Sequence, residues 1–352
     1  DYDKCILKLL VGVTLFIAVA TAMVGPISFL GLIIANLSRQ MLKTYRHTQL
    51  ILGSALFGMI VLIGGQLLVE HVFSYSIPVS VFITVGGGIY FLYLLLKKRG
   101  NRMHVKDLIK KYDGKTVVDS VSFEIPKGKV TSLIGPNGAG KSTVMSMLSR
   151  LIAGDSGTVG LEGKNIERWK SRDLSKRLAI LTQSIHIEMK LTVRELVTFG
   201  RFPYSGGRIT QEDQKIIDQA IEYMELQEFE NQFIDELSGG QRQRACIAMV
   251  IAQDTEYVLL DEPTNNLDIY HATNMMKTVR RLCDELGKTV ILVLHEINYA
   301  AFYSDYICAF KSGKIAKFGT VKEVIRKEVL SEIYHVDFEI MEIEGKPLSI
   351  YY

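Results

Sequence analysis

The sequence predicts an α/β domain that follows an all-helical apolar segment. Residues 1–96 hold most of the apolar excess of a 352-residue chain that is 48% hydrophobic. From residue 103 onward the chain becomes charged, and short β-type runs alternate with helical patterns, as in α/β domains. A glycine-rich run at 135–142 stands between an expected strand and an expected helix. We therefore expect a membrane part at 1–98, a junction at 99–103, an α/β domain at 104–335 and a tail at 336–352.

The membrane part rests on four nearly uncharged stretches, 9–24, 27–37, 51–69 and 77–96. The last two are about 20 residues long, which is enough for a helix to cross about 30 Å of hydrocarbon. The stretch 27–37 follows Gly25-Pro26 and reaches only part-way across unless it extends or belongs to a broken helix. The sequence thus predicts an N-terminal all-α transmembrane segment of about four helices.

Basic residues predict how this segment is oriented. Arg39, Lys43 and Arg46 lie between the second and third stretches, and another basic group lies at 97–102. The connection 70–76 has no lysine or arginine. By the positive-inside rule, both basic groups face the cytosol and the connection faces out.

Charge and cysteine content exclude other classes of site. The net charge of +3 is too small to indicate a nucleic-acid partner. Cys5, Cys246, Cys283 and Cys308 are scattered without metal-ligand spacing, so we expect reduced thiols that pack in the interior.

The α/β region contains six expected strands, at 117–125, 130–134, 178–181, 257–260, 289–294 and 306–310. Helical patterns occur at 143–151, 211–225, 241–252, 270–286 and 321–327. The section 191–236 is almost entirely helical and interrupts the strands, so we expect an inserted helical subdomain there. Alternating apolar residues in the tail predict a hairpin around Gly345-Lys346-Pro347.

The glycine-rich run fits the phosphate-binding pattern G-x-x-x-x-G-K-[ST] at every fixed position, with the sequence Gly135-Pro136-Asn137-Gly138-Ala139-Gly140-Lys141-Ser142. Its glycines allow a sharp turn that points amides inward, at a helix N-terminus where the dipole favours anions. Lys141 supplies a charge to the β- and γ-phosphates, and the Ser142 hydroxyl is a ligand for Mg²⁺. The run predicts an α/β P-loop NTPase that binds a nucleoside triphosphate.

Four other short segments fit the same chemistry. The apolar strand 257–260 ends in Asp261 and Glu262, which suit a Mg²⁺ ligand and a group that polarises the attacking water. Gln183 and His295 each follow a strand, where open α/β sheets bind ligands. The segment Leu237-Ser238-Gly239-Gly240-Gln241 starts a helix and offers amides to an anion. Tyr112 is placed to stack on an adenine ring.

Together these motifs resemble the ATP-binding-cassette (ABC) ATPases from about residue 103 to 331, in the family's order. The resemblance implies ATP and Mg²⁺ as cofactors, and Glu262 as general base with His295 as γ-phosphate sensor. It also implies Mg²⁺ ligation by Ser142, Asp261 and Gln183, with Gln183 coupling to the permease. The nucleotide-binding set is Tyr112, 135–142 with Lys141, Thr143, Ser238, Gly239, Gly240, Gln241 and Asp268. Ser238 and Gly240 would contact ATP on a second, head-to-tail ATPase subunit.

The segment 191–204, which includes Gly200-Arg201-Phe202-Pro203-Tyr204, is similar to ATPases of iron–siderophore, haem and cobalamin importers. The form Asn265-Asn266-Leu267-Asp268 favours the catecholate-siderophore branch. The resemblance implies ATP-driven import of an iron–siderophore complex across the bacterial cytoplasmic membrane, with the ATPase domain on the cytosolic face. It implies permease subunits and an extracytoplasmic siderophore-binding protein as partners. A haem or cobalamin importer is the alternative.

The membrane part is similar to the last four of ten helices in the matching FecCD-type permeases, through the run 24–33. Permease and ATPase are normally separate chains in such importers, and the junction at 99–103 is abrupt. We therefore expect that two neighbouring genes are joined here, with Met103 as an original start.

Two other function classes stay open from the residues. One is a soluble ABC ATPase of DNA repair or the ribosome with an artefactual membrane part, which the segment 191–204 and the small charge disfavour. The other is a non-catalytic membrane scaffold, which the intact Glu262 and His295 disfavour.

Overall fold

The computed structural model describes residues 34, 38, 47–72, 81, 84–89, 102–182, 190–265 and 267–351. The chain divides into two compact units, Asp1–Gly100 and Asn101–Tyr352. Each unit is described by itself. The expected site residue Gln183 and the expected apolar stretch 9–24 lie outside the described residues, as does most of 27–37 and 77–96.

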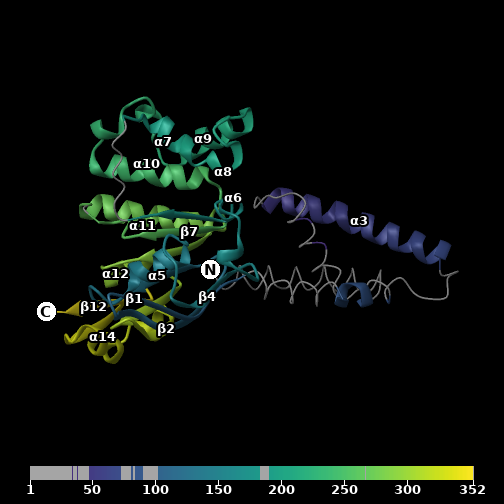
Figure 1. Cartoon of the computed structure of the whole chain (residues 1–352). Helices are drawn as coiled ribbons and strands as arrows, with labels where there is room; N and C mark the ends of the chain where they lie inside the picture. The colour runs from purple at the N-terminus through teal and green to yellow at the C-terminus, as the bar shows by residue number, and fades with distance from the viewer. Residues whose placement is uncertain are drawn as a thin grey trace. The chain divides into compact units, whose positions relative to one another are not determined.

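The main described element of the N-terminal unit is α3, a helix of 26 residues at His47–Val72 (Figure 1). It contains the expected helical stretch 51–69. Large apolar side chains along α3 are exposed, among them Ile51, Leu52, Leu56, Ile60 and Ile63. In the part of the chain that the structure describes, no helix combines the length and the apolar character needed to cross a membrane.

The C-terminal unit is built on a six-stranded sheet with the order β10-β9-β3-β8-β7-β6. The five strands from β9 to β6 are parallel, and β10 pairs with β9 in the antiparallel sense. Their bounds are β3 Val130–Ile134, β6 Leu178–Leu181, β7 Tyr257–Asp261, β8 Thr289–Val293, β9 Tyr306–Lys311 and β10 Lys314–Thr320. Every residue of β3, β7 and β8 is buried, which is typical of strands covered on both faces.

Alternate residues of these strands enter two different cores. Val258 and Leu260 of β7 join a core with α11 (Ile269–Asp284), α12 (Ile297–Tyr303) and the helical subdomain. Tyr257 and Leu259 point to the other face and pack with α5 (Lys141–Leu148) and the strands of a second sheet. This period of two is what a strand with two buried faces requires.

The second sheet is antiparallel and has the order β2-β1-β4-β5. Its strands are β1 Met103–Tyr112, β2 Lys115–Ile125, β4 Ser156–Leu161 and β5 Lys164–Asn165. Of these four strands, the sequence pattern predicted only β2, over residues 117–125. The strand β1 is charged and its pairing with β2 shifts register three times, so it lacks a regular alternation. The short elements η1 (Ile166–Arg168) and α6 (Ser171–Leu174) follow this sheet.

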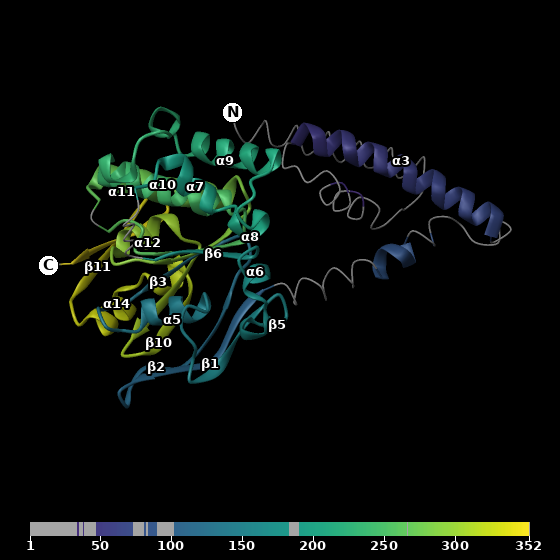
Figure 2. The same cartoon turned by 45° about the horizontal axis from the view of Figure 1, so that its top comes forward.

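The expected helical subdomain is present. It contains α7 (Val193–Phe199), α8 (Phe202–Ser205), α9 (Gln211–Tyr223) and the short turns η2 (Gln227–Phe229) and η3 (Ile234–Glu236). The helix α10 (Gly239–Ala252) lies beside α7 and α9, although the predicted boundary is at residue 236 (Figures 1 and 2). Gly200 allows this packing, since a Cβ there would lie 2.2 Å from the carbonyl oxygen of Met249.

A buried ion pair holds the subdomain together. Arg201 Nε donates to Asp213 Oδ1 at 2.8 Å, and both side chains are almost fully buried. Arg201 also donates to the carbonyl oxygen of Ala252 at the end of α10 and lies over the Tyr204 ring. Asp213 in turn caps α9 through Thr210. The motif at 200–204 therefore ties α8, α9 and α10 to one another.

We expect Arg201→Met to lower the free energy of unfolding by about 3–5 kcal/mol, because it leaves the Asp213 carboxylate buried and unpaired. Urea denaturation of the full chain measures this loss. Arg208→Met, at an exposed position of the same subdomain, is the control and should change stability by less than about 0.5 kcal/mol. Equal losses in the two variants would show that the ion pair does not hold the subdomain.

The chain ends with α13 (Val321–Val324), α14 (Lys327–Tyr334) and the hairpin β11 (Phe338–Ile343) and β12 (Lys346–Tyr351). The predicted tail hairpin is thus confirmed. Its docking depends on Asn298 of α12, whose amide pairs with the backbone N–H, the carbonyl oxygen and the hydroxyl of Ser349. The Asn298 side chain therefore satisfies the backbone N–H and carbonyl of Ser349, as a neighbouring strand would.

The described cysteines fit the expectation of packing thiols. Cys246, Cys283 and Cys308 are buried and free. Burial raises the pKa of the Cys246 thiol to about 11, which keeps it protonated at neutral pH.

Candidate nucleotide site

The loop 135–142 connects β3 to α5, and its three glycines have backbone conformations that other residues rarely adopt. Gly135 has φ +144°, and a Cβ there would lie 2.3 Å from the carbonyl oxygen of Phe310. Gly140 has φ +96°, and a Cβ there would lie 2.8 Å from the carbonyl oxygen of Val117. The neighbouring turn braces the loop, since the Gly313 amide donates to the carbonyl oxygen of Ala139. The glycines therefore permit the close approach of β2 and β9 that fixes the loop.

Lys141 points into the loop. Its ammonium donates to the carbonyl oxygens of Gly135 at 2.7 Å and Pro136 at 3.0 Å, and the residue is only 5% exposed. Burial lowers the pKa of Lys141, while the negative charges of Glu262 and Asp261 oppose this shift. Its only hydrogen-bond partners among the described residues are these neutral carbonyls, so this buried ammonium is well placed to receive an anion.

The strand β7 brings Asp261 to the start of α5. There it meets Ser142, which lies 119 residues earlier in the sequence. The Ser142 hydroxyl donates to Asp261 Oδ1 at 3.2 Å. Burial raises the pKa of Asp261, and the hydrogen bond from Ser142 partly opposes this. A hydroxyl and a carboxylate oxygen thus lie together beside the phosphate-binding loop.

Glu262 follows directly and has a left-handed backbone conformation, with φ +52°. Its amide donates to the carbonyl oxygen of Val293 at the end of β8. The Glu262 carboxylate hydrogen-bonds to Nε2 of His295, which lies beyond the same strand, and Asn265 Nδ2 donates to its other oxygen. Left-handed backbone conformations in non-glycine residues occur in turns and cluster at active sites.

A hollow of about 160 Å³ lies beside the loop. Its walls come from the loop and first turn of α5, from Glu262, from His295 and from Val117. The structure therefore brings together the loop, Ser142, Thr143, Glu262 and His295, as the sequence led us to expect. Val117 was not expected there, because its position depends on the docking of β2 on the loop.

The segment 238–241 lies outside the walls of that hollow. Ser238 caps α10, since its hydroxyl accepts from the Gln241 amide at 3.3 Å and the Gln241 side chain accepts from the Ser238 amide at 2.9 Å. Asp268 caps α11 in a similar way, through the His271 amide. The exposed Tyr112, at the end of β1, also lies outside the walls of the hollow.

Comparisons with known proteins define the class. The model of the family described as ABC transporter matches residues 118–265, and that of the FecCD transport family matches residues 1–97. The chain belongs to the ABC transporter family, as a member of its ATP-binding proteins, which are ATPases.

Two relatives show how specific this likeness is. A petrobactin import ATP-binding protein of Bacillus subtilis, YclP, is 50% identical over 250 residues, which are 71% of this chain and 99% of the relative. The iron(3+)-hydroxamate import ATP-binding protein FhuC of the same organism is 42% identical over 68% of this chain and 91% of its own length.

Solved structures agree. A dimeric bacterial ABC transporter cassette matches with a TM-score of 0.57 and 28% identity, over 62% of this chain and 98% of that one. A post-hydrolysis state of that cassette, bound to ADP and phosphate, matches with a TM-score of 0.56 and 28% identity, with the same coverage.

Proposed function

We propose that this chain hydrolyses ATP to power the import of ferric siderophores across the bacterial cytoplasmic membrane. The observation that carries this proposal is the 50% identity to a petrobactin import ATP-binding protein along 99% of that relative. The hydroxamate relative supports the wider class of iron chelates. Haem and cobalamin remain the alternative cargoes suggested by the segment 191–204.

For the reaction, we assign ATP phosphates to the loop 135–142, with Lys141 as the charged donor. Glu262 holds and deprotonates the attacking water, because its carboxylate lies at the edge of the hollow and His295 fixes its direction. His295 lines the same hollow, so we assign its ring to the terminal phosphate. Tyr112 is assigned to the adenine ring, and Gln183 to the metal and to the permease.

The oxygens of Ser142 and Asp261 fit Mg²⁺, because a hydroxyl and a carboxylate 3.2 Å apart are hard ligands that this ion prefers. When bound, Mg²⁺ would neutralise charge on the phosphates. Burial raises the pKa of Asp261, and a bound cation would favour its ionised form.

We further propose that two copies pair head-to-tail. The hollow is lined by the loop, Glu262 and His295, and by none of the residues 238–241. The exposed Ser238, Gly239 and Asp268 and the half-buried Gln241 would therefore complete the site of a second copy, together with Gly240. The likeness to a dimeric cassette supports this arrangement.

For residues 1–98, we propose part of a FecCD-type permease of about four transmembrane helices. The family match over 1–97 and the exposed apolar side chains of α3 support a membrane environment. The ATPase unit would then lie on the cytosolic face. We also propose that 1–98 and 104–352 derive from neighbouring genes. A stop codon between Lys98 and Met103 in the locus would establish two proteins, and an open frame would establish one.

The cargo is tested in lipid vesicles that contain the full chain and permease subunits. A siderophore-binding protein is added on the side of the membrane from which the substrate enters. We expect ferric petrobactin to stimulate ATP hydrolysis and radioactive iron uptake. Vesicles with Glu262→Gln should show neither effect. Stimulation by haem or cobalamin, without any by ferric petrobactin or a ferric hydroxamate, would contradict the siderophore assignment.

A further inference from the structure

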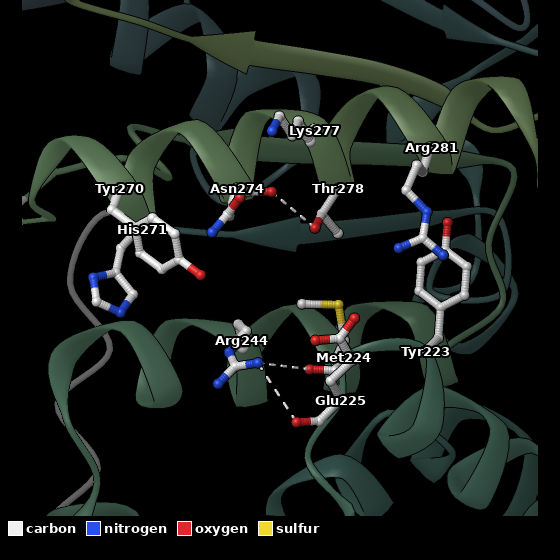
Figure 3. Close-up of a pocket in the computed structure, with 10 residues that line it drawn as sticks. All are labelled: Tyr223, Met224, Glu225, Arg244, Tyr270, His271, Asn274, Lys277, Thr278 and Arg281. Carbon is white, nitrogen blue, oxygen red and sulfur yellow. Dashed lines mark hydrogen bonds between the residues drawn. The ribbon is translucent and has the colours of Figure 1, made fainter.

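His271 connects the N-terminal turns of α10 and α11. Figure 3 shows it at one end of a groove between these helices, with Tyr270, Asn274 and Thr278 along α11 and Arg244 opposite on α10. The groove holds about 370 Å³. His271 lies in the first turn of α11, three residues after Asp268.

Two hydrogen bonds fix the backbone and the ring of His271 relative to Asp268. Asp268 Oδ1 accepts from the His271 amide at 2.8 Å and lies 2.8 Å from His271 Nδ1. Because a carboxylate oxygen only accepts, Nδ1 carries the proton of the ring in this contact. These bonds lower the pKa of Asp268, so its carboxylate stays ionised at neutral pH. The ring cannot turn away without losing this bond.

The other side of the ring covers the first turn of α10. A Cβ placed on Gly240 would lie 2.4 Å from His271 Cδ2, 2.9 Å from Cγ and 3.0 Å from Nε2. All three nearest atoms belong to the imidazole, and Gly240 itself is buried. A side chain at residue 240 would displace the ring, so the absence of one lets the two helix ends meet.

We propose that His271 is a positioning residue that holds Asp268 and the segment Ser238–Gln241 together as one rigid surface. This inference rests on the proposed function, in which both parts complete the ATP site of a second copy. His271 is not among the residues that line the hollow with the phosphate-binding loop and Glu262. Its effect should therefore fall on turnover in the paired state and leave nucleotide affinity of the single chain unchanged.

Steady-state ATP hydrolysis by His271→Ala in the full chain tests this proposal. We expect kcat to fall about 10- to 100-fold, since small misplacement of site residues has effects of this size, with KM for ATP within about twofold. His271→Asn should restore kcat to within about threefold, because its amide donates from the place of Nδ1. His271→Phe keeps a ring over Gly240 but no donor, so it should lie between the two.

The matched control is Lys277→Ala, an exposed residue of the same helix for which the described residues provide no partner. It should leave kcat unchanged. An unchanged kcat in His271→Ala would overturn the positioning role. So would a rise in KM for ATP by as large a factor as the fall in kcat. So would a failure of His271→Asn to restore activity.

Amide hydrogen exchange separates this inference from the proposed function. In His271→Ala, peptides that cover 238–244 should exchange faster than in the unmodified chain, with or without ATP hydrolysis. If the unmodified chain hydrolyses no ATP, the proposed function fails and the exchange result still decides whether His271 holds α10. Unchanged exchange in that segment would overturn the contact itself.

Discussion

Glu262→Gln should reduce ATP turnover by about 10²- to 10⁴-fold while ATP binding persists, because the variant loses the base that takes the proton of the attacking water. The amide is isosteric, and the buried side chain keeps its place beside His295. The backbone at φ +52° is unaffected, since the substitution changes only the end of the side chain. Phosphate release under saturating ATP measures turnover, and equilibrium binding of a labelled nucleotide measures affinity.

Glu296→Gln is the matched control. Its carboxylate is exposed, next to His295 in sequence, and no described residue bonds to it. This variant should keep full turnover. If Glu262→Gln retained turnover equal to that of the control, Glu262 would not be the base, and another group would have to activate water.

Lys141→Met should weaken ATP binding by about 10- to 150-fold, because hydrogen bonds to charged groups contribute about 1.5–3 kcal/mol. The methionine keeps the apolar stem but not the ammonium that now bonds to Gly135 and Pro136. Burial already disfavours the charged form of Lys141, so we expect no loss of folding stability. Titration with a labelled nucleotide gives the affinity, and thermal unfolding gives the stability.

Lys215→Met, on the exposed side of α9, controls for the loss of one positive charge. It should bind ATP as the unmodified chain does. An affinity unchanged by Lys141→Met would mean that the loop does not hold the phosphates, and a large loss of stability would mean that Lys141 serves the fold instead.

The site was predictable where one short segment carries its own geometry. The strand β3, the glycine turn and the start of α5 follow each other in sequence, so spacing alone predicted the loop and Lys141. Asp261 and Glu262 follow a buried apolar strand, and the parallel sheet brings them to the same edge. The predicted bounds of β3 and β6 agree with the structure to the residue.

Contacts between distant segments were not predictable in this way. The charged strand β1 has no regular alternation, because its pairing is interrupted by register shifts. Val117 reaches the hollow only because β2 docks on the loop through Gly140 and Gly313. The His271 ring meets Gly240 only because the first turns of α10 and α11 lie side by side in the fold. No local pattern encodes these contacts, since they depend on tertiary packing.

The paired ATP site is the central claim, and ATP-driven association of the full chain in detergent tests it most directly. Light scattering should show that Glu262→Gln forms a dimer when ATP is added and reverts when ATP is removed. Addition of Ser238→Arg to that chain should abolish the ATP-dependent dimer, because Ser238 lies outside its own hollow and would face the nucleotide of the partner. An ATP-dependent dimer that is insensitive to Ser238→Arg, or no response to ATP at all, would contradict the account.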